Sequence, residues 1–307
     1  GYIPYDVNIA ENAARTLEYA YADFCIWKLG ESLGKSEYDK ALYKSRAGNY
    51  VNLFDHETKL MRGRNSDGSF QSPFSPYKWG DAFTEGNSWH YTWSVFHDIQ
   101  GLIDLMGGRE EFAAMLDSVF VVPPIFDYSY YGYVIHEIRE MQVMNMGNYA
   151  HGNQPIQHMI YLYNYAGQPW KSQYRVREVL DKLYDYTADG YCGDEDNGQT
   201  SAWYVFSAMG FYPVAPGTGE YVIGSPLFRK ITFTPQGGRE FVIEAENNSA
   251  ENVYISRANL NGKDISRNYI THSELKDGGR LNFTMSSRPD NKHGTAVEDA
   301  PYSMKRE

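Results

Sequence analysis

The chain has 307 residues, enough for two domains of ordinary size, and carries 28 Lys and Arg against 39 Asp and Glu, a formal net charge of −11 at pH 7. This acidic balance argues against general nucleic-acid binding, which needs a basic surface against the phosphates. No apolar run approaches the ~18 residues of a membrane-spanning helix, so we expect no membrane span.

Up to about residue 212, the apolar residues recur with helical spacing. Apolar positions three, four and seven apart, with polar residues between them, predict about eight helices. These helices cover approximately residues 17–29, 38–55, 87–105, 109–119, 132–147, 155–166, 170–185 and 200–210.

The pattern changes after the Pro- and Gly-rich stretch 212–219. Short alternating runs, separated by turns that contain Gly and Asn, predict strands at 230–235, 240–246, 252–260 and 280–286. We therefore predict a mainly α protein, with a helical domain over residues 1–214 and a C-terminal β-strand domain over residues 215–307. We expect the tail, 298–307, to fray.

The most acidic stretch is Gly193–Gln199, which reads GDEDNGQ and precedes a predicted helix. Its glycines indicate a sharp turn that presents Asp194 and Asp196 as alternate carboxylates. An EF-hand calcium loop does not fit, because Gln199 and Val205 stand where that loop needs Gly and Glu. Catalysis and simple capping of the following helix both remain open.

A second candidate carboxyl group is Glu85, in the sequence TEGNSWHYTW at the start of a predicted helix. Aromatic neighbours such as Trp89 would raise the pKa of a carboxyl group, as a general acid that works near neutral pH requires. The alternative is an ordinary glutamate at a helix N-terminus.

Two further stretches combine histidines with carboxylates or amides. His136-Glu137-Ile138-Arg139-Glu140 is not a zinc-protease motif, because Glu140 stands where the second histidine would be. His136 and Glu140 still share a helix face, as a surface pair or as part of a binding site. The stretch with His151, Asn153 and Gln154 favours a polar cleft.

Nucleophile elbows, phosphate-binding glycine loops and paired cysteines are missing from the sequence. Aromatic residues make up 16% of the chain, and flat rings beside polar groups suit sugars. Glycoside hydrolysis needs only two carboxyl groups from the protein. It is therefore the enzyme chemistry that the residues favour.

Taken together, these stretches resemble glycoside hydrolase family 92, the calcium-dependent exo-acting α-mannosidases. The resemblance runs through blocks in the same order along nearly the whole chain: LEYAYADFCI (17–26), RGRNSDGSF (62–70), FTEGNSWHYTWSVFHD (83–98), HGNQPIQHMIYLYNYAGQPWK (151–171) and GDEDNGQTSAWYVFSAMGFYPVAPGTGEYVIGSPLF (193–228). It implies an (α/α)6-type helical toroid, incomplete in this chain, followed by a small antiparallel β-sandwich. Members also carry an N-terminal β-sandwich, so we expect an N-terminal portion of the same protein, or another copy, to complete this one.

The resemblance implies an inverting mechanism and assigns roles to the candidate residues. Glu85 matches the catalytic acid, and Asp194 and Asp196 match the carboxylates of the base, with Asp196 in the direct role. The implied calcium ion would take Asn153, Gln154 and Glu140 as ligands. Many members have Glu where this chain has Gln154.

Recognition of the leaving sugar by His136 and Glu137 is implied for members that cleave α-1,2-mannosides, which points to terminal mannose on N-glycans or mannan. Trp89 and His151 are further candidates for sugar contacts. A calcium-dependent carbohydrate-binding protein without catalysis, or an inverting glucosidase on a similar toroid, is the alternative. We expect a periplasmic or secreted bacterial protein, whose export signal is not present in this chain.

Overall fold

The computed structural model describes residues 1–306 and divides the chain into two compact units. The first unit contains residues 1–157 together with residues 303–306 near the end of the chain. The second unit is His158–Tyr302. The predicted domains, 1–214 and 215–307, follow the change from helical to strand pattern and remain a prediction.

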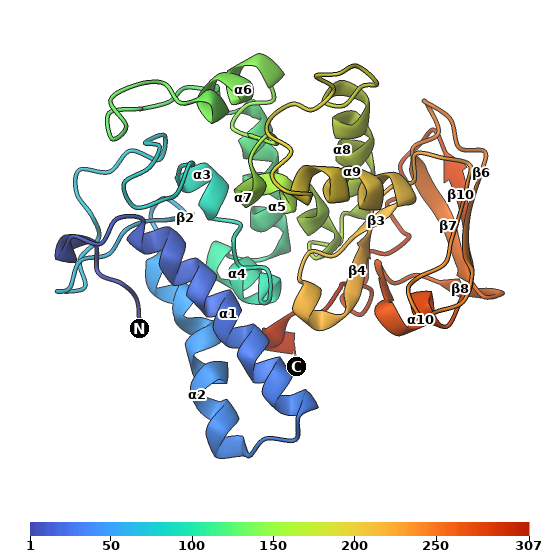
Figure 1. The fold of residues 1–307 in the computed structure, drawn as a ribbon, viewed down its shortest axis with the longest axis horizontal. Coiled ribbons are helices and arrows are strands. Elements are labelled where there is room, and N and C mark those ends of the chain that lie inside the picture. Colours follow the sequence, from blue (N-terminus) through green and yellow to red (C-terminus); the bar gives the residue numbers. More distant parts are fainter. Residues whose placement is uncertain (307) are drawn as a thin grey trace. The chain divides into compact units, whose positions relative to one another are not determined.

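The first unit is mainly helical (Figure 1). Its longest helices, α1 (Asn12–Ser32) and α2 (Glu37–Ala47), pack side by side as a hairpin. The shorter elements are listed here in chain order: η1 (Tyr5–Val7), η2 (Gly48–Leu53), β1 (Phe54–Asp55), β2 (Leu60–Met61), α3 (Ser88–Tyr91), α4 (Ile99–Met106), α5 (Arg109–Val121), α6 (His136–Met144), α7 (Gln154–Gln157) and η5 (Met304–Arg306). Strands β1 and β2 form an antiparallel pair.

The helix predicted over 87–105 is wrong in one respect, because the chain forms two helices there, α3 and α4. Asn87 caps α3 by accepting a hydrogen bond from the His90 N–H at 3.3 Å. Asp98 caps α4, and the left-handed Gly107 ends it. Two polar caps within one apolar stretch start two helices, since each satisfies backbone N–H groups that a continuous helix would bond internally.

The second unit begins with helices and ends with sheets. Its elements are η3 (Met159–Asn164), α8 (Pro169–Lys182), α9 (Gln199–Met209), β3 (Phe211–Tyr212), η4 (Pro216–Thr218), β4 (Glu220–Ile223), β5 (Lys230–Phe233), β6 (Phe241–Glu246), β7 (Tyr254–Leu260), β8 (Lys263–Ile265), β9 (Tyr269–Thr271), α10 (His272–Lys276) and β10 (Gly279–Ser286). All four predicted strand segments are confirmed by β5, β6, β7 and β10.

The five-stranded sheet has the order β5-β6-β10-β7-β8, and a second sheet has the order β3-β4-β9. Along β10, Leu281, Phe283 and Met285 alternate with more exposed residues and face a common apolar core with Phe241 and Ile255. The mainly α class with C-terminal sheets is confirmed. One detail differs from the prediction: β10 runs parallel to β6, because the chain crosses through α10 before it enters the sheet between β6 and β7.

The tail is not frayed over residues 303–306. The buried carboxylate of Asp98 accepts hydrogen bonds from the Ser303 hydroxyl and the Lys305 N–H, both at 2.8 Å. The Met304 N–H donates to the His97 carbonyl at 2.8 Å. These contacts fix the 3-10 turn η5 against α4, and polarity of the tail sequence alone did not predict them.

The hairpin of α1 and α2 exposes several large apolar side chains. Leu29, Leu33 and Leu42 are each more than half exposed, at 58%, 62% and 56%. They belong to a groove of about 840 Å³ along the hairpin. Among the described residues, no helix combines the length and the apolar character needed to cross a membrane.

Candidate active site

Glu85 lies in the first unit, on the loop that precedes α3, and its side chain is exposed. Its backbone is left-handed, with φ = +44°. That conformation costs a residue with a side chain about 1–3 kcal/mol, and such residues cluster at functional sites. The exposed carboxyl group is therefore presented by a backbone that the surrounding structure must hold in place.

Both backbone polar groups of Glu85 bind side chains. The Glu85 N–H donates to the Tyr131 hydroxyl at 3.1 Å, and the Asn153 amide donates to the Glu85 carbonyl at 2.8 Å. Burial raises the pKa of Tyr131 to about 12, with the Glu85, Glu11 and Glu137 charges acting in the same direction. The hydroxyl consequently stays protonated near neutral pH.

Trp89 lies on α3 and is half-buried, with its ring centroid 6.5 Å from that of Tyr77. The same short helix is fixed by Asn87, which caps it, and by His90, whose ring accepts from the Asn87 N–H at 3.1 Å. Burial lowers the pKa of His90 to about 3, so its ring is neutral. The indole is thus attached to a rigid turn directly after Glu85.

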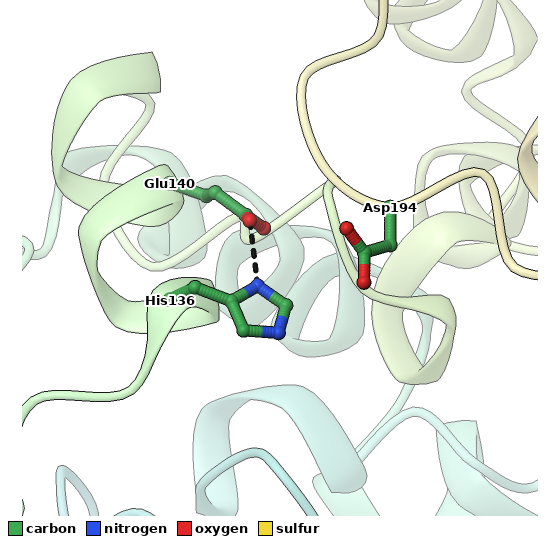
Figure 2. A group of neighbouring side chains, drawn as sticks. All are labelled: His136, Glu140 and Asp194. Atoms are coloured by element: carbon green, nitrogen blue, oxygen red, sulfur yellow. Dashed lines mark hydrogen bonds and ion pairs between the residues drawn. The ribbon is translucent and has the colours of Figure 1, made fainter.

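The predicted cluster on α6 is present in the first unit. Figure 2 shows the hydrogen bond between His136 Nδ1 and Glu140 Oε1, which are 2.7 Å apart. His136 Nε2 lies 3.2 Å from Glu137 Oε1. His136 is exposed, whereas Glu137 is buried and its second carboxylate oxygen has no hydrogen-bond partner among the described residues. Asp194, also labelled in Figure 2, belongs to the second unit.

The stretch Tyr149–Gln154 orders the loop before α7. His151 is completely buried, and its Nδ1 is 2.8 Å from the Tyr149 hydroxyl. Burial lowers its pKa to about 3. Within this unit His151 presents no surface to a sugar, and its role in binding remains only a prediction. Asn153 is also buried, and its Oδ1 accepts from the Gln154 N–H at 3.1 Å.

In the second unit, Asp194 and Asp196 are exposed on the loop before α9. Asp196 has φ = +57° and continues into left-handed Asn197 and Gly198. The Thr200 hydroxyl donates to the Asp194 carbonyl at 2.9 Å, and the Gly198 N–H donates to Glu195 Oε2 at 2.9 Å. The Glu195 side chain therefore helps to stabilise this turn.

The sequence prediction missed Tyr131. It belongs to the stretch YSYYGY, 128–133, which contains four tyrosines in six residues. That density, which reaches into the start of the helix predicted over 132–147, was the available signal. The structure brings Tyr131, Asn153 and Glu85 together within the first unit, whereas Asp194 and Asp196 belong to the other.

Comparison with known proteins agrees with these observations. Residues 1–287 match the family model of the glycosyl hydrolase family 92 catalytic domain. The chain is 56% identical to an inverting mannosidase of this family from Bacteroides thetaiotaomicron, with a TM-score of 0.88 over 99% of this chain and 41% of that one. It is 39% identical to an α-mannosidase from the same organism in complex with mannoimidazole, with a TM-score of 0.89 over 98% of this chain and 39% of that one.

An uncharacterized secreted glycosidase from the fungus Arthroderma benhamiae is 32% identical over 99% of this chain and 40% of its own length. These matches show the family of the chain and confirm the fold class. The chain belongs to glycosyl hydrolase family 92. It spans about two fifths of the length of the relatives named here.

Proposed function

We propose that the protein is an inverting exo-acting α-mannosidase that releases terminal mannose. The observation that carries this proposal is the exposed carboxyl group of Glu85, on a left-handed backbone held at both peptide groups, within a chain that matches family 92 over residues 1–287. The description of a 56% identical relative as an inverting mannosidase supports the same reaction.

In this mechanism Glu85 is the general acid. Its proton passes to the glycosidic oxygen as the bond from that oxygen to the anomeric carbon breaks. General acid catalysis contributes about 10²–10⁴-fold, and more for a poor leaving group such as a sugar hydroxyl. Exposure of Glu85 suits this role, because the acid must be reprotonated from solvent after each turnover.

Asp196, with Asp194, supplies the general base. The carboxylate takes a proton from water, and the water oxygen bonds to the anomeric carbon on the face opposite to the leaving group. Inverting enzymes hold their two carboxyl groups about 6.5–9.5 Å apart to leave room for that water. Exposure of both aspartates, on a turn stabilised by Glu195, supports this assignment.

A calcium ion is part of the proposal. The candidate ligands Asn153, Gln154 and Glu140 fit in donor chemistry, because all three offer oxygen atoms, which hard cations prefer. Asn153 Oδ1 already accepts the Gln154 N–H and has a second lone pair for a metal. When bound, calcium would supply positive charge to sugar hydroxyl groups.

We further propose that the substrate is α-1,2-linked mannose on N-glycans or mannan, and that the protein works in the periplasm or outside the cell. Support for the linkage comes from the exposed His136 beside the buried carboxylate of Glu137. A secreted glycosidase among the relatives supports the location.

The test is a substrate screen with the full-length protein. Aryl α-mannoside, aryl α-glucoside and α-1,2-mannobiose are each assayed with and without a chelator, and NMR identifies the first-formed anomer. We expect hydrolysis of the two mannosides with β-mannose as the first product. Binding without turnover would instead support the lectin alternative, and α-glucoside hydrolysis the glucosidase alternative.

The residue assignment is tested with Glu85→Gln, with the exposed Glu57→Gln as a matched control in the same unit. We expect at least ~10²-fold loss of kcat on mannobiose for Glu85→Gln and parental activity for the control. A parental rate for Glu85→Gln would show that another group is the acid.

A further inference from the structure

Glu85 is one of a few residues with a long side chain on a left-handed backbone, together with Glu11 and Lys59. Most of the residues with positive φ are Gly, Asn or Asp, which tolerate this region, and Glu85 is a longer side chain with φ = +44°. Glu85 is followed by the buried Gly86, whose carbonyl accepts a hydrogen bond from the Gly80 N–H at 3.0 Å. The loop is thereby tied to residue 80 on one side and to α3 on the other.

Tyr131 reaches Glu85 because its segment is fixed to the stretch before Gly80. The Trp79 N–H donates to the Asp127 carbonyl and the Asp127 N–H to the Tyr77 carbonyl, both at 2.9 Å. A turn from Tyr128 then carries the chain to Tyr131, whose N–H donates to the Tyr128 carbonyl at 3.1 Å. The tyrosine hydroxyl is therefore brought to Glu85 by an ordered backbone.

Gly80 makes room for this arrangement. A Cβ atom at Gly80 would lie 2.3 Å from the Tyr130 ring and 2.9 Å from Tyr131 Cζ. Gly80 also has φ = +78°, which a side chain would strain. The close approach of a glycine backbone to both rings keeps the Tyr131 hydroxyl within hydrogen-bond reach of the Glu85 N–H.

Asn153 holds the other peptide group of Glu85. Its own N–H donates to the Ala150 carbonyl at 3.1 Å, and the Gln157 amide donates to the His151 carbonyl at 3.1 Å. These bonds fix the turn from which the Asn153 amide donates to the Glu85 carbonyl. Asn153 is only 6% exposed, so water does not compete freely for the hydrogen bond of this amide to the Glu85 carbonyl.

We propose that Tyr131 and Asn153 are positioning residues that direct the Glu85 side chain by holding the peptide groups on both sides of it. This inference rests on the proposed role of Glu85 as the acid. The direction of the Cα–Cβ bond follows from the two flanking peptide planes, so fixing both planes fixes where the carboxyl group starts. A small displacement of an acid reduces proton transfer steeply, because that step needs hydrogen-bond geometry.

Both contacts can be removed with small changes. Tyr131→Phe keeps the ring and removes the hydroxyl that accepts a hydrogen bond from the Glu85 N–H. Asn153→Asp removes the amide donor and keeps the shape and a side-chain oxygen, so a calcium ligand at this position would be retained. Tyr130→Phe is the matched control, since Tyr130 is the exposed neighbour that packs edge-on against Tyr131.

The decisive measurement is the dependence on the leaving group in the full-length protein. A misplaced acid slows cleavage of α-1,2-mannobiose, whose leaving group needs a proton, much more than cleavage of an aryl α-mannoside with an acidic phenol. We expect about 10- to 100-fold loss of kcat on mannobiose and less than about 5-fold on the aryl mannoside. Tyr130→Phe should keep parental rates, and melting temperatures are measured for every variant.

Equal losses on both substrates would overturn the proposal, and so would parental mannobiose rates in both variants. Recovery of Asn153→Asp at higher calcium, with equal losses on both substrates, would show instead that Asn153 acts through the metal. If Tyr131→Phe does not fold, Asn153→Asp alone decides. A parental mannobiose rate for Glu85→Gln would overturn both the assignment of Glu85 as the acid and this inference. If Glu85→Gln loses more activity on mannobiose than on the aryl mannoside but Tyr131→Phe and Asn153→Asp do not, only the positioning roles are overturned.

Discussion

Asp98→Ala tests how much the buried carboxylate that joins Tyr50 to the returning C-terminal segment stabilises the first unit. The Asp98 carboxylate is 3% exposed and accepts from the Tyr50 hydroxyl at 2.7 Å, from the Ser303 hydroxyl at 2.8 Å and from the Lys305 N–H at 2.8 Å. Burial, followed by the charge of Asp98, raises the pKa of Tyr50, so this hydroxyl stays protonated and remains a donor.

The expected loss follows from the donors that the substitution leaves behind. Tyr50 and Ser303 are 2% and 1% exposed, so neither hydroxyl reaches water easily once the carboxylate is gone. A hydrogen bond to a charged group is worth about 1.5–3 kcal/mol, so two such bonds predict a loss of about 3–6 kcal/mol. We count only these two buried hydroxyls and leave out the N–H of Lys305, which is an exposed residue.

The measurement is urea denaturation of the purified protein followed by tryptophan fluorescence. Asp104→Ala is the control, since Asp104 pairs with the Lys305 side chain at 2.8 Å in an exposed ion pair, which is worth less than about 1 kcal/mol. If Asp98→Ala lowers the free energy of unfolding by no more than the control does, then the buried carboxylate does not stabilise the first unit as argued.

Three further predictions concern metal, pH and self-association. A chelator should abolish mannosidase activity, and Ca²⁺ should restore it better than Zn²⁺, because the candidate ligands are oxygens. Full activity without bound calcium would exclude a role of the ion in catalysis. His90 and His151, with pKa values lowered to about 3 by burial, stay neutral in the folded protein and take up protons near pH 6.5 when unfolded. The free energy of unfolding should therefore be highest above pH 6.5 and fall as the pH drops from 6.5 toward 3, by about 1.4 kcal/mol per histidine per pH unit. Urea denaturation midpoints measured at pH 7 and pH 5 check this. Residues 1–307 should self-associate through the exposed Leu29, Leu33 and Leu42, whereas a protein that stays monomeric on sizing would contradict this.

The sequence predicted the helices and strands best where one periodic pattern runs without interruption. α5 lies within two residues of its predicted range, and β5 begins at the expected Lys230. The break between α3 and α4 was not predicted, because apolar spacing continues through Trp93 and Val95 while caps at Asn87 and Asp98 divide the helix. Periodicity reports which side chains are apolar, and caps report where backbone hydrogen bonding stops.

For the candidate site, sequence blocks identified the exposed carboxyl groups, and the structure adds what holds them. Glu85, Asp194 and Asp196 are all exposed on loops. Tyr131 could not be assigned from sequence, because its contact with Glu85 joins residues 46 positions apart and uses only the backbone of Glu85. The buried, neutral ring of His151 also could not be inferred from a polar stretch that reads like a cleft.

The return of residues 303–306 makes the first unit discontinuous, with the second unit inserted into it. During synthesis on a ribosome, residues 1–157 emerge early, but the donors from Ser303 and Lys305 emerge only after the whole inserted unit. Until then the Asp98 carboxylate lacks two of its partners. Completion of the first unit therefore waits for the second to be made, so truncations that end before residue 303 should lose stability in a unit far from the cut in sequence.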